Sequence, residues 1–80
     1  MNTREAVAAR ILELCHAREL TPNGLSNLSA VPQSTIKSIL NGVSQNPGIV
    51  TIKKLCDGLD ITLAEFFSTP VFDSLEQEIY

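Results

Sequence analysis

One short segment of this chain has side chains that can hydrogen-bond to the edges of nucleic-acid bases. In the run Gln33-Ser-Thr-Ile-Lys-Ser38, Gln33 can bond adenine N6 and N7 together, and Lys37 can donate to guanine O6 and N7 or to a phosphate. Ser34 and Ser38 can donate or accept, to bases or to the sugar-phosphate backbone. Taken alone, however, such a pattern is typical of the solvated face of an amphipathic helix. The elements around the segment decide between the two interpretations.

The residues from Leu20 to Gly42 predict two short helices joined by a tight corner. Thr21 is a good N-cap for the first of them, and Pro22 suits its first helical position. The body of this helix is poor in helix-forming residues. We therefore expect it to be held by Leu25 and Leu28 packing on neighbouring elements.

The second helix of the pair is expected to span about Gln33 to Leu40 and to carry the polar segment. Pro32 has no side-chain acceptor, so we expect it to be the first helical residue rather than the cap. Asn41-Gly42 is a left-handed stop signal. A loop over residues 43–48 follows.

Three further helices are predicted around this pair, so the expected fold is all-α, a compact bundle of about five short helices. The first should span Thr3–Arg18 and the fourth Ile49–Gly58. Thr62-Leu-Ala-Glu65 is a capping box that opens a short fifth helix including Phe66 and Phe67. No sustained period-2 run predicts a strand. The residues expected to face the core are Val7, Ile11, Leu14, Cys15, Ile36, Ile39, Ile49, Ile52, Leu55, Cys56 and Leu59.

The spacing of this helix pair resembles the helix-turn-helix of the phage-repressor (Cro/C1, or XRE) family of DNA-binding regulators. Ser26 is the small residue expected where the two helices touch. Ala30 follows at the corner, where the family usually has Gly, and Ile36 and Ile39 fall where the second helix faces the core. The resemblance covers about Val7 to Phe67, so it implies a phage-repressor-like DNA-binding domain over most of the chain.

The resemblance implies that the outward face of the second helix of the pair enters the major groove of double-stranded DNA. The family's pattern places Gln33, Ser34, Lys37 and Ser38 on that face as base-contacting residues. Phosphates are expected at helix N-termini, since free N–H groups and the helix dipole favour anions. They are also expected at the loop over residues 43–48. The residues expected to contact phosphates are Thr21, Asn23, Thr35, Ser44, Gln45 and Asn46.

The distribution of charge favours this partner although the net charge is −3. Residues 1–19 are balanced, residues 20–56 hold three Lys and no acid, and residues 57–80 hold six acids and no base. The segment that resembles a DNA reader is therefore the only positive one. Many relatives carry Lys or Arg in the loop over 44–46, whereas this chain has Ser, Gln and Asn there. We therefore expect weak DNA binding per subunit. A homodimer on a palindromic operator, the family's usual arrangement, is implied.

The sequence divides into an expected DNA-binding domain over residues 1–69 and a short acidic tail over 70–80. In the tail, Phe72, Leu75 and Ile79 are spaced by 3 and 4, which predicts one apolar helical face. We expect this face to pack on the domain or on a partner. The acidic side is expected to stay away from DNA, because carboxylates repel phosphates.

No other chemistry is indicated. Cys15 and Cys56 lack Cys-x-x-Cys spacing, so we expect buried structural thiols and no metal site. His16 adjoins Cys15 on one helix, where the two side chains do not face each other as a nucleophile pair would, so we expect it to be solvated. We therefore predict a protein that is not an enzyme and needs no cofactor or small-molecule ligand.

The leading hypothesis is sequence-specific binding of double-stranded DNA by a small bacterial or phage-type transcriptional regulator. The alternative is a protein-interaction module of antitoxin or adaptor type that keeps the fold without strong DNA binding. The scarce cations favour this alternative, and the acid-free central segment disfavours it. No apolar run approaches the roughly 20 residues of a membrane span, and the N-terminus does not resemble a signal peptide. A cytoplasmic location is expected.

Overall fold

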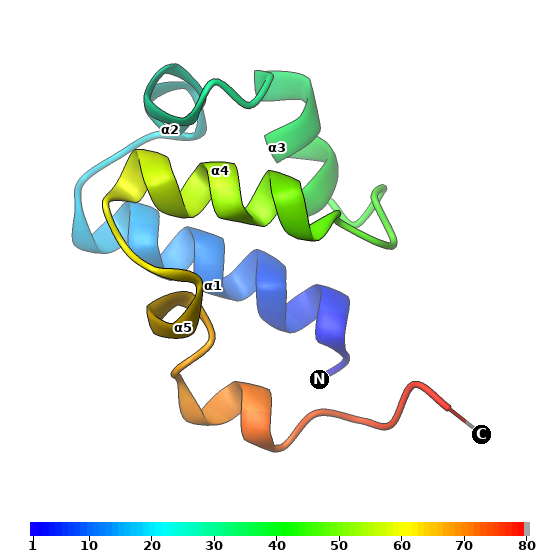
Figure 1. The fold of residues 1–80 in the computed structure, drawn as a ribbon. Coiled ribbons are helices and arrows are strands. Elements are labelled where there is room, and N and C mark those ends of the chain that lie inside the picture. Colours follow the sequence, from blue (N-terminus) through cyan, green and yellow to red (C-terminus); the bar gives the residue numbers. More distant parts are fainter. Residues whose placement is uncertain (80) are drawn as a thin grey trace.

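Five α-helices and one short 3-10 helix follow one another along residues 1–79 (Figure 1). The computed structural model describes residues 1–79, and none of these residues is in a strand, which confirms the all-α expectation. Among the same residues, no helix has the length and apolar character needed to cross a bilayer. The elements are α1 (Thr3–Ala17), α2 (Pro22–Ser29), α3 (Gln33–Leu40), α4 (Ile49–Leu59), α5 (Leu63–Phe66) and η1 (Pro70–Asp73).

α1 begins with a reciprocal pair of hydrogen bonds. Glu5 N–H donates to Asn2 Oδ1 at 2.8 Å, and Asn2 N–H donates to the Glu5 carboxylate at 3.0 Å. Two amides that a helix start would leave without partners are thereby satisfied. The helix ends one residue earlier than expected. Its buried residues include the whole predicted stripe: Ala6, Val7, Ala8, Ile11, Leu14 and Cys15.

α2 starts as the sequence predicts. Thr21 is the N-cap, its Oγ1 accepts from Gly24 N–H at 3.0 Å, and Pro22 is the first helical residue. These features fix where α2 begins although its composition is unfavourable for a helix.

The inner face of α2 differs from the expectation. Leu25 is fully buried, but Leu28 is 57% exposed, so the prediction that Leu28 packs inward was wrong. Ser29 takes the inner position one turn after Leu25, and its hydroxyl donates to Leu25 O at 2.7 Å. The reason is steric, because α4 packs against α2 with Gly58 directly on the backbone of Ser29.

α3 begins after Pro32, which is its N-cap with ψ 141°. We had expected Pro32 to be the first helical residue, and that prediction was wrong. The chain leaves the left-handed corner in an extended conformation, and the helix starts only at the next residue. The Pro32 carbonyl accepts from Thr35 N–H at 3.0 Å. At the other end, Gly42 has the predicted left-handed conformation, φ 76°, and Val43 N–H donates back to Ser38 O at 3.0 Å.

α4 buries the apolar stripe made by Ile52, Leu55, Cys56 and Leu59. Ile49 was expected to extend this stripe, but it is 59% exposed, so that prediction was wrong. α4 packs against α2 and α5, whereas Ile49 and Val50 in its first turn stay mostly exposed to solvent.

α5 starts at the predicted capping box, with Glu65 N–H donating to Thr62 Oγ1 at 3.0 Å. Phe66 is fully buried, and its ring contacts Phe67 edge-on, with centroids 4.8 Å apart. Phe72 of η1 contacts Phe67 in the same way at 5.0 Å. This aromatic cluster attaches η1 to the bundle.

The segment beyond η1 does not form the helical face that the sequence predicted. η1 ends at Asp73, and no helix follows through residue 79, while Ile79 is 78% exposed. The chain instead runs past the start of α1, where Glu76 N–H donates to Met1 O at 3.4 Å and Thr3 Oγ1 donates to Glu78 Oε2 at 2.8 Å. Tyr80 lies outside the described residues.

Candidate nucleic-acid interface

The corner between α2 and α3 is closed by side-chain hydrogen bonds to the backbone. Ser26 Oγ donates to Val31 O at 2.6 Å, so the small residue expected at this position also ties the corner together. Ala30 has φ 60° and ψ 18°, the left-handed conformation for which relatives usually have Gly. Val31 N–H donates to Ser29 Oγ at 3.3 Å. The angle between α2 and α3 is thus set by local bonds.

The orientation of α3 is fixed by its buried side. Ile36 and Ile39 are 0% and 1% exposed, which confirms the predicted core face. On the opposite side, Gln33, Ser34 and Lys37 are exposed. Thr35 and Ser38 are half-buried, between the exposed and the buried side of the helix.

The outward face of α3 is free of competing groups. No acidic residue occurs in α3, and no side chain caps its start. The amides of Gln33 and Ser34 therefore remain at an uncapped N-terminus, where the helix dipole favours anions. Neutral donors, one cation and an open N-terminus can all face a nucleic acid without electrostatic repulsion.

Apart from Thr35 in α3, the residues expected at phosphates lie at the start of α2 and in the loop after α3. Thr21 and Asn23 are exposed at the start of α2, where Thr21 Oγ1 is already the acceptor of the cap bond and retains its O–H to donate. In the loop after α3, Ser44 is half-buried and Asn46 is exposed. Gln45 is exposed, but its Nε2 donates to Gly42 O at 2.6 Å, so part of its hydrogen-bonding capacity holds the loop.

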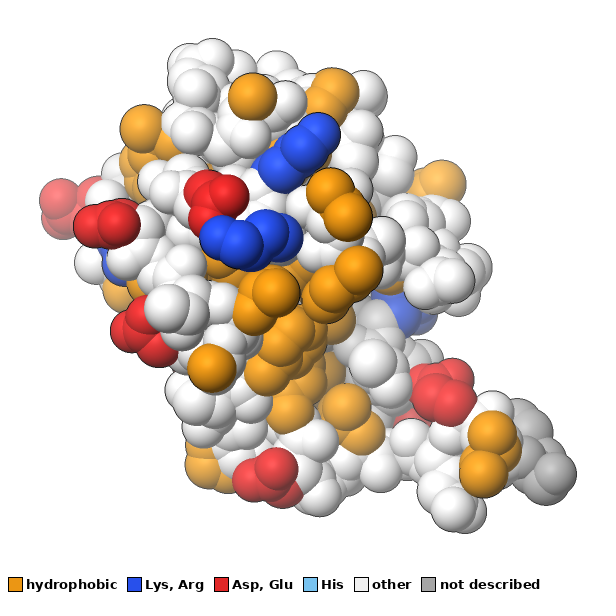
Figure 2. Space-filling model, in the orientation of Figure 1, with side chains coloured by type: hydrophobic (Ala, Val, Ile, Leu, Met, Phe, Trp, Pro, Cys, Tyr) orange, Lys and Arg blue, Asp and Glu red, His pale blue; other side chains and the backbone are white. Residues whose placement is uncertain are grey.

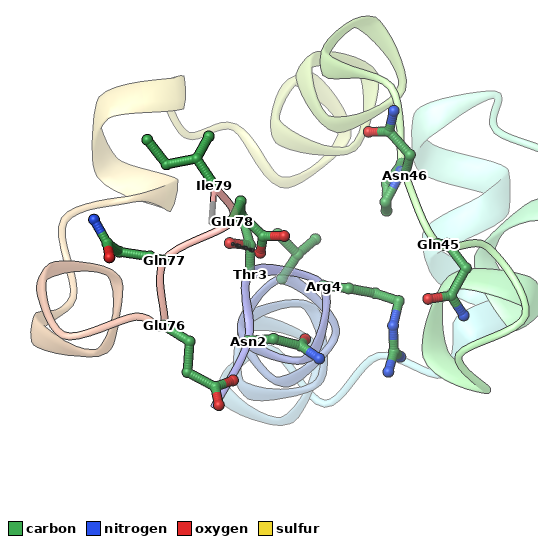
Figure 3. Close-up of a pocket in the computed structure, with 11 residues that line it drawn as sticks. Asn2, Thr3, Arg4, Gln45, Asn46, Glu76, Gln77, Glu78 and Ile79 are labelled. Carbon is green, nitrogen blue, oxygen red and sulfur yellow. Dashed lines mark hydrogen bonds between the residues drawn. The ribbon is translucent and has the colours of Figure 1, made fainter.

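The structure adds a cation that the sequence interpretation missed. Arg4, at the start of α1, reaches the end of α3, where its Nη1 lies 2.7 Å from the place a Cβ on Gly42 would occupy. It also lines an open pocket of about 950 Å³ together with Gln45 and Asn46 (Figure 3). Residues this far apart in the sequence carry no local signal of their contact, so counting charge by segments assigned Arg4 to a neutral helix.

The cationic surface of α4 is weaker than the sequence count implied. Lys53 forms an ion pair with Asp57 one turn later, so an acid from the downstream segment offsets one of the three Lys of residues 20–56. Figure 2 shows few blue side chains on the face it presents, with one of them directly beside a red one. Lys37 and Lys54 form no ion pair with any residue from 1 to 79.

The acidic tail and the loop after α3 line one pocket from opposite sides (Figure 3). Glu76 and Glu78 line the same open pocket as Arg4, Gln45 and Asn46, on the side opposite the loop (Figure 3). This part of the tail therefore shares a pocket with residues expected to contact phosphates, and the expectation that the acids stay away from DNA remains a prediction.

The remaining reactive side chains lie elsewhere. Cys15 and Cys56 are buried and unpaired, as expected, and burial raises the pKa of both thiols above the ordinary value. His16 is exposed on α1. Residues 1–79 contain no group of three or more His, Cys, Asp or Glu side chains placed to hold a metal ion.

A bundle in which a locally braced corner presents one polar helix outward is a helix-turn-helix domain. The model of the Cro/C1-type HTH DNA-binding domain matches residues 10–71, most of the chain. The chain belongs to this Cro/C1-type helix-turn-helix family, which supports the general role of a DNA-binding transcription regulator. Proteins of this family typically act without catalysing a reaction.

Two solved structures are similar to the chain. The crystal structure of the prophage Lp1 protein 11 superposes with a TM-score of 0.81 and 34% identity, covering 94% of this chain and all of that one. An HTH_3 family transcriptional regulator from Vibrio cholerae has a TM-score of 0.75 and 26% identity over 81% of this chain. That match covers 36% of the Vibrio cholerae chain. No curated protein matches the sequence.

Proposed function

We propose that this protein is a small transcriptional regulator of bacterial or phage type that binds double-stranded DNA sequence-specifically, with α3 in the major groove. The observation that carries the proposal is the outward face of α3. Gln33, Ser34 and Lys37 are exposed there, while Ile36 and Ile39 hold the helix to the core. Base edges are distinguished in the major groove by donors and acceptors of these types.

In this proposal each side chain has a stated role. Gln33 bonds an adenine, Lys37 bonds a guanine or a phosphate, and Ser34 and Ser38 bond either bases or backbone. Phosphates are bound at the start of α2 by Thr21 and by the amide and side chain of Asn23. The residues proposed for the remaining phosphate contacts are Thr35, Ser44, Gln45 and Asn46.

We further propose that two copies bind a palindromic operator. The described residues offer few unpaired cations, and each missing cation lowers the contribution of counterion release to binding. A second subunit doubles the phosphate contacts and the bases read, with half-sites about one helical turn apart. The regulator acts in the cytoplasm, where bacterial and phage DNA lies.

The second candidate is a protein-interaction module of antitoxin or adaptor type. The Lys53–Asp57 ion pair and the exposed apolar residues Val43, Ile49 and Val50 favour it, because they leave a less cationic and more apolar surface. It predicts no sequence preference for DNA.

Selection of bound fragments from a random pool of duplex DNA tests the proposal. The wild-type protein should enrich a two-fold symmetric sequence. Gln33→Ala should relax the preference at one base pair of each half-site and weaken binding to the best site by about 1–3 kcal/mol. Lys37→Ala should also weaken binding. Both side chains point outward, so helicity and melting temperature should not change.

Lys54→Gln is the matched control, because it removes an exposed cation from α4, an element that carries none of the residues proposed to contact DNA. Its selected sequence should equal that of the wild type. A wild-type protein that enriches no sequence contradicts the proposal and favours the interaction module. Unchanged selection by both α3 variants, with the fold intact, excludes α3 as the reading element.

A further inference from the structure

Arg4 occupies a position that joins the start of α1 to the loop after α3. Its guanidinium lies against Gly42, because Arg4 Nη1 is 2.7 Å from the position that a Cβ on Gly42 would occupy. Arg4 is half-buried, so its stem is held by the protein while part of the side chain stays in contact with solvent. In Figure 3 the side chain extends from α1 toward Gln45.

The guanidinium of Arg4 has no direct partner within the described structure. No ion pair or hydrogen bond joins its guanidinium to any residue from 1 to 79. Arg10, by contrast, donates to the carbonyls of Phe66 and Glu65 at 2.8 Å and pairs with Glu13. The two arginines of α1 therefore differ, since Arg10 donates to the backbone of α5 and Arg4 keeps its donors available in the lining of a pocket.

The pocket places this cation among polar residues of the loop after α3. Arg4, Gln45 and Asn46 line one open cavity of about 950 Å³, and Glu76 and Glu78 of the tail line its opposite side. The loop itself contains no Lys or Arg from residue 43 to residue 48. A guanidinium is planar, carries five donors and binds phosphate oxygens in pairs, so it suits an anion better than the amides beside it.

We propose that Arg4 is a DNA-phosphate-binding residue, which supplies from α1 the cation that the loop after α3 lacks. The proposal rests on the proposed function, because it places the sugar-phosphate backbone against this loop when α3 lies in the major groove. Arg4 then contacts a phosphate next to Asn46, and its contribution is independent of base sequence.

A structural role is the competing explanation. A cation beside the last turn of α3 stabilises the helix dipole, and this effect acts on folding without any DNA. The two roles are separated by the salt dependence of binding, since a bound phosphate releases counterions and a helix-dipole interaction does not. The slope of log K against log salt concentration changes by about 0.9 for each phosphate that the protein no longer neutralises.

The experiment measures binding of the full chain to a fluorescent 25-base-pair duplex of mixed sequence. The NaCl concentration is varied between about 50 and 200 mM, a range over which the affinity of a phosphate-binding protein falls steeply. Arg4→Gln should weaken binding at low salt and flatten the slope by about 0.9 per bound subunit. Arg4→Lys should keep most of the slope because it keeps the charge. Lys54→Gln, the matched neutralisation on α4, should leave the slope close to that of the wild type. Melting curves establish that each variant is folded.

A second measurement on the unaltered protein does not depend on a variant that folds. Phenylglyoxal modifies accessible guanidinium groups, and mass spectrometry reports the modified site. The duplex should protect Arg4 at least several-fold, and protection should disappear as salt displaces the DNA.

The outcomes separate this inference from the proposed function. If the wild-type protein does not bind duplex DNA at any salt concentration, the proposed function fails and this inference fails with it. If the wild-type protein binds but Arg4→Gln has an unchanged slope, or DNA leaves Arg4 equally reactive, only the role of Arg4 is wrong. An equal reduction of slope in Lys54→Gln also overturns it, because the effect would then come from net charge.

Discussion

The backbone of Ser29 lies 2.9 Å from the position that a Cβ on Gly58 would occupy. Both its N and its Cα are at that distance, so α2 and α4 cross with the backbone of one helix against the missing side chain of the other. Real Cβ atoms do not approach backbone atoms so closely. The absence of a side chain at Gly58 therefore determines how deeply α2 sits in the bundle, and with it the position of the corner that carries α3.

Gly58→Ala should destabilise the fold, because backbone atoms cannot yield as the end of a flexible side chain can. We expect a loss of about 1–3 kcal/mol in the free energy of unfolding, as for other overpacked sites, despite the better helix propensity of Ala. Gly24→Ala is the matched control. A Cβ there would meet Leu20 and Thr21 side-chain atoms at 3.4 and 3.5 Å, so this change should be neutral or stabilise by up to about 1 kcal/mol. Equal urea midpoints for the two variants would contradict the close crossing.

Ala30→Gly should stabilise the protein. Ala30 has φ 60°, a left-handed conformation that costs an L side chain about 1–2 kcal/mol, whereas Gly adopts it freely but loses more chain entropy on folding. The expected net gain is about 0.5–1 kcal/mol, measured by urea unfolding. Ala9→Gly, on the exposed side of α1, should instead cost about 0.5–1 kcal/mol. A loss of stability in Ala30→Gly would mean that the corner is not strained.

The elements that the sequence predicted well are those set by neighbouring residues. Thr21-Pro22, Asn41-Gly42 and the box from Thr62 to Glu65 each act within one turn, and all three appear where they were expected. The corner was also recognisable, because Ser26 and Ala30 have fixed spacing within one motif. Helical periodicity then identified most of the core.

The features that sequence reasoning missed depend on contacts between distant segments. Leu28 and Ile49 have apolar side chains at plausible spacing, but whether they are covered depends on where α4 begins and where it crosses α2. The approach of Arg4 to Gly42 brings together one residue that precedes the helix pair in the sequence and one that follows it. The proposed base-contacting residues were identified from family spacing, and the structure adds their exposure; their contacts with DNA stay a prediction.

The capping box of α5 should make the free energy of unfolding fall as the pH is lowered. Thr62 N–H donates to the Glu65 carboxylate at 2.9 Å, and this bond, followed by the one with the Thr62 side chain, lowers the pKa of Glu65. A carboxyl whose pKa is lower in the folded state adds stability above its unfolded pKa, about 4.3, and that contribution is lost as the pH falls through the folded value.

Carboxyl chemical shifts in an NMR titration should therefore give Glu65 a midpoint below the ordinary Glu range. Thr62→Val removes the hydroxyl and keeps the backbone donor, so it should return the pKa of Glu65 only part of the way. Glu65→Gln should flatten the decline of stability between pH 5 and pH 3, a window taken from the unfolded pKa of about 4.3. An ordinary midpoint for Glu65 in the folded protein would show that the box is not formed in solution.

The acidic tail should weaken DNA binding through Glu76 and Glu78. Both carboxylates line the pocket opposite Asn46, and phosphates at that loop would be repelled by them. Neutralising both, as Glu76→Gln with Glu78→Gln, should strengthen binding to a mixed-sequence duplex several-fold at low salt and less at high salt, because screening shortens the range of the repulsion. The fold should persist, since the tail's bonds to the start of α1 are exposed.

Asp73→Asn is the control, because Asp73 is exposed on η1 and does not line the pocket. An equal gain in Asp73→Asn would assign the effect to net charge, and unchanged affinity in the double variant would place the bound phosphates away from this side of the protein.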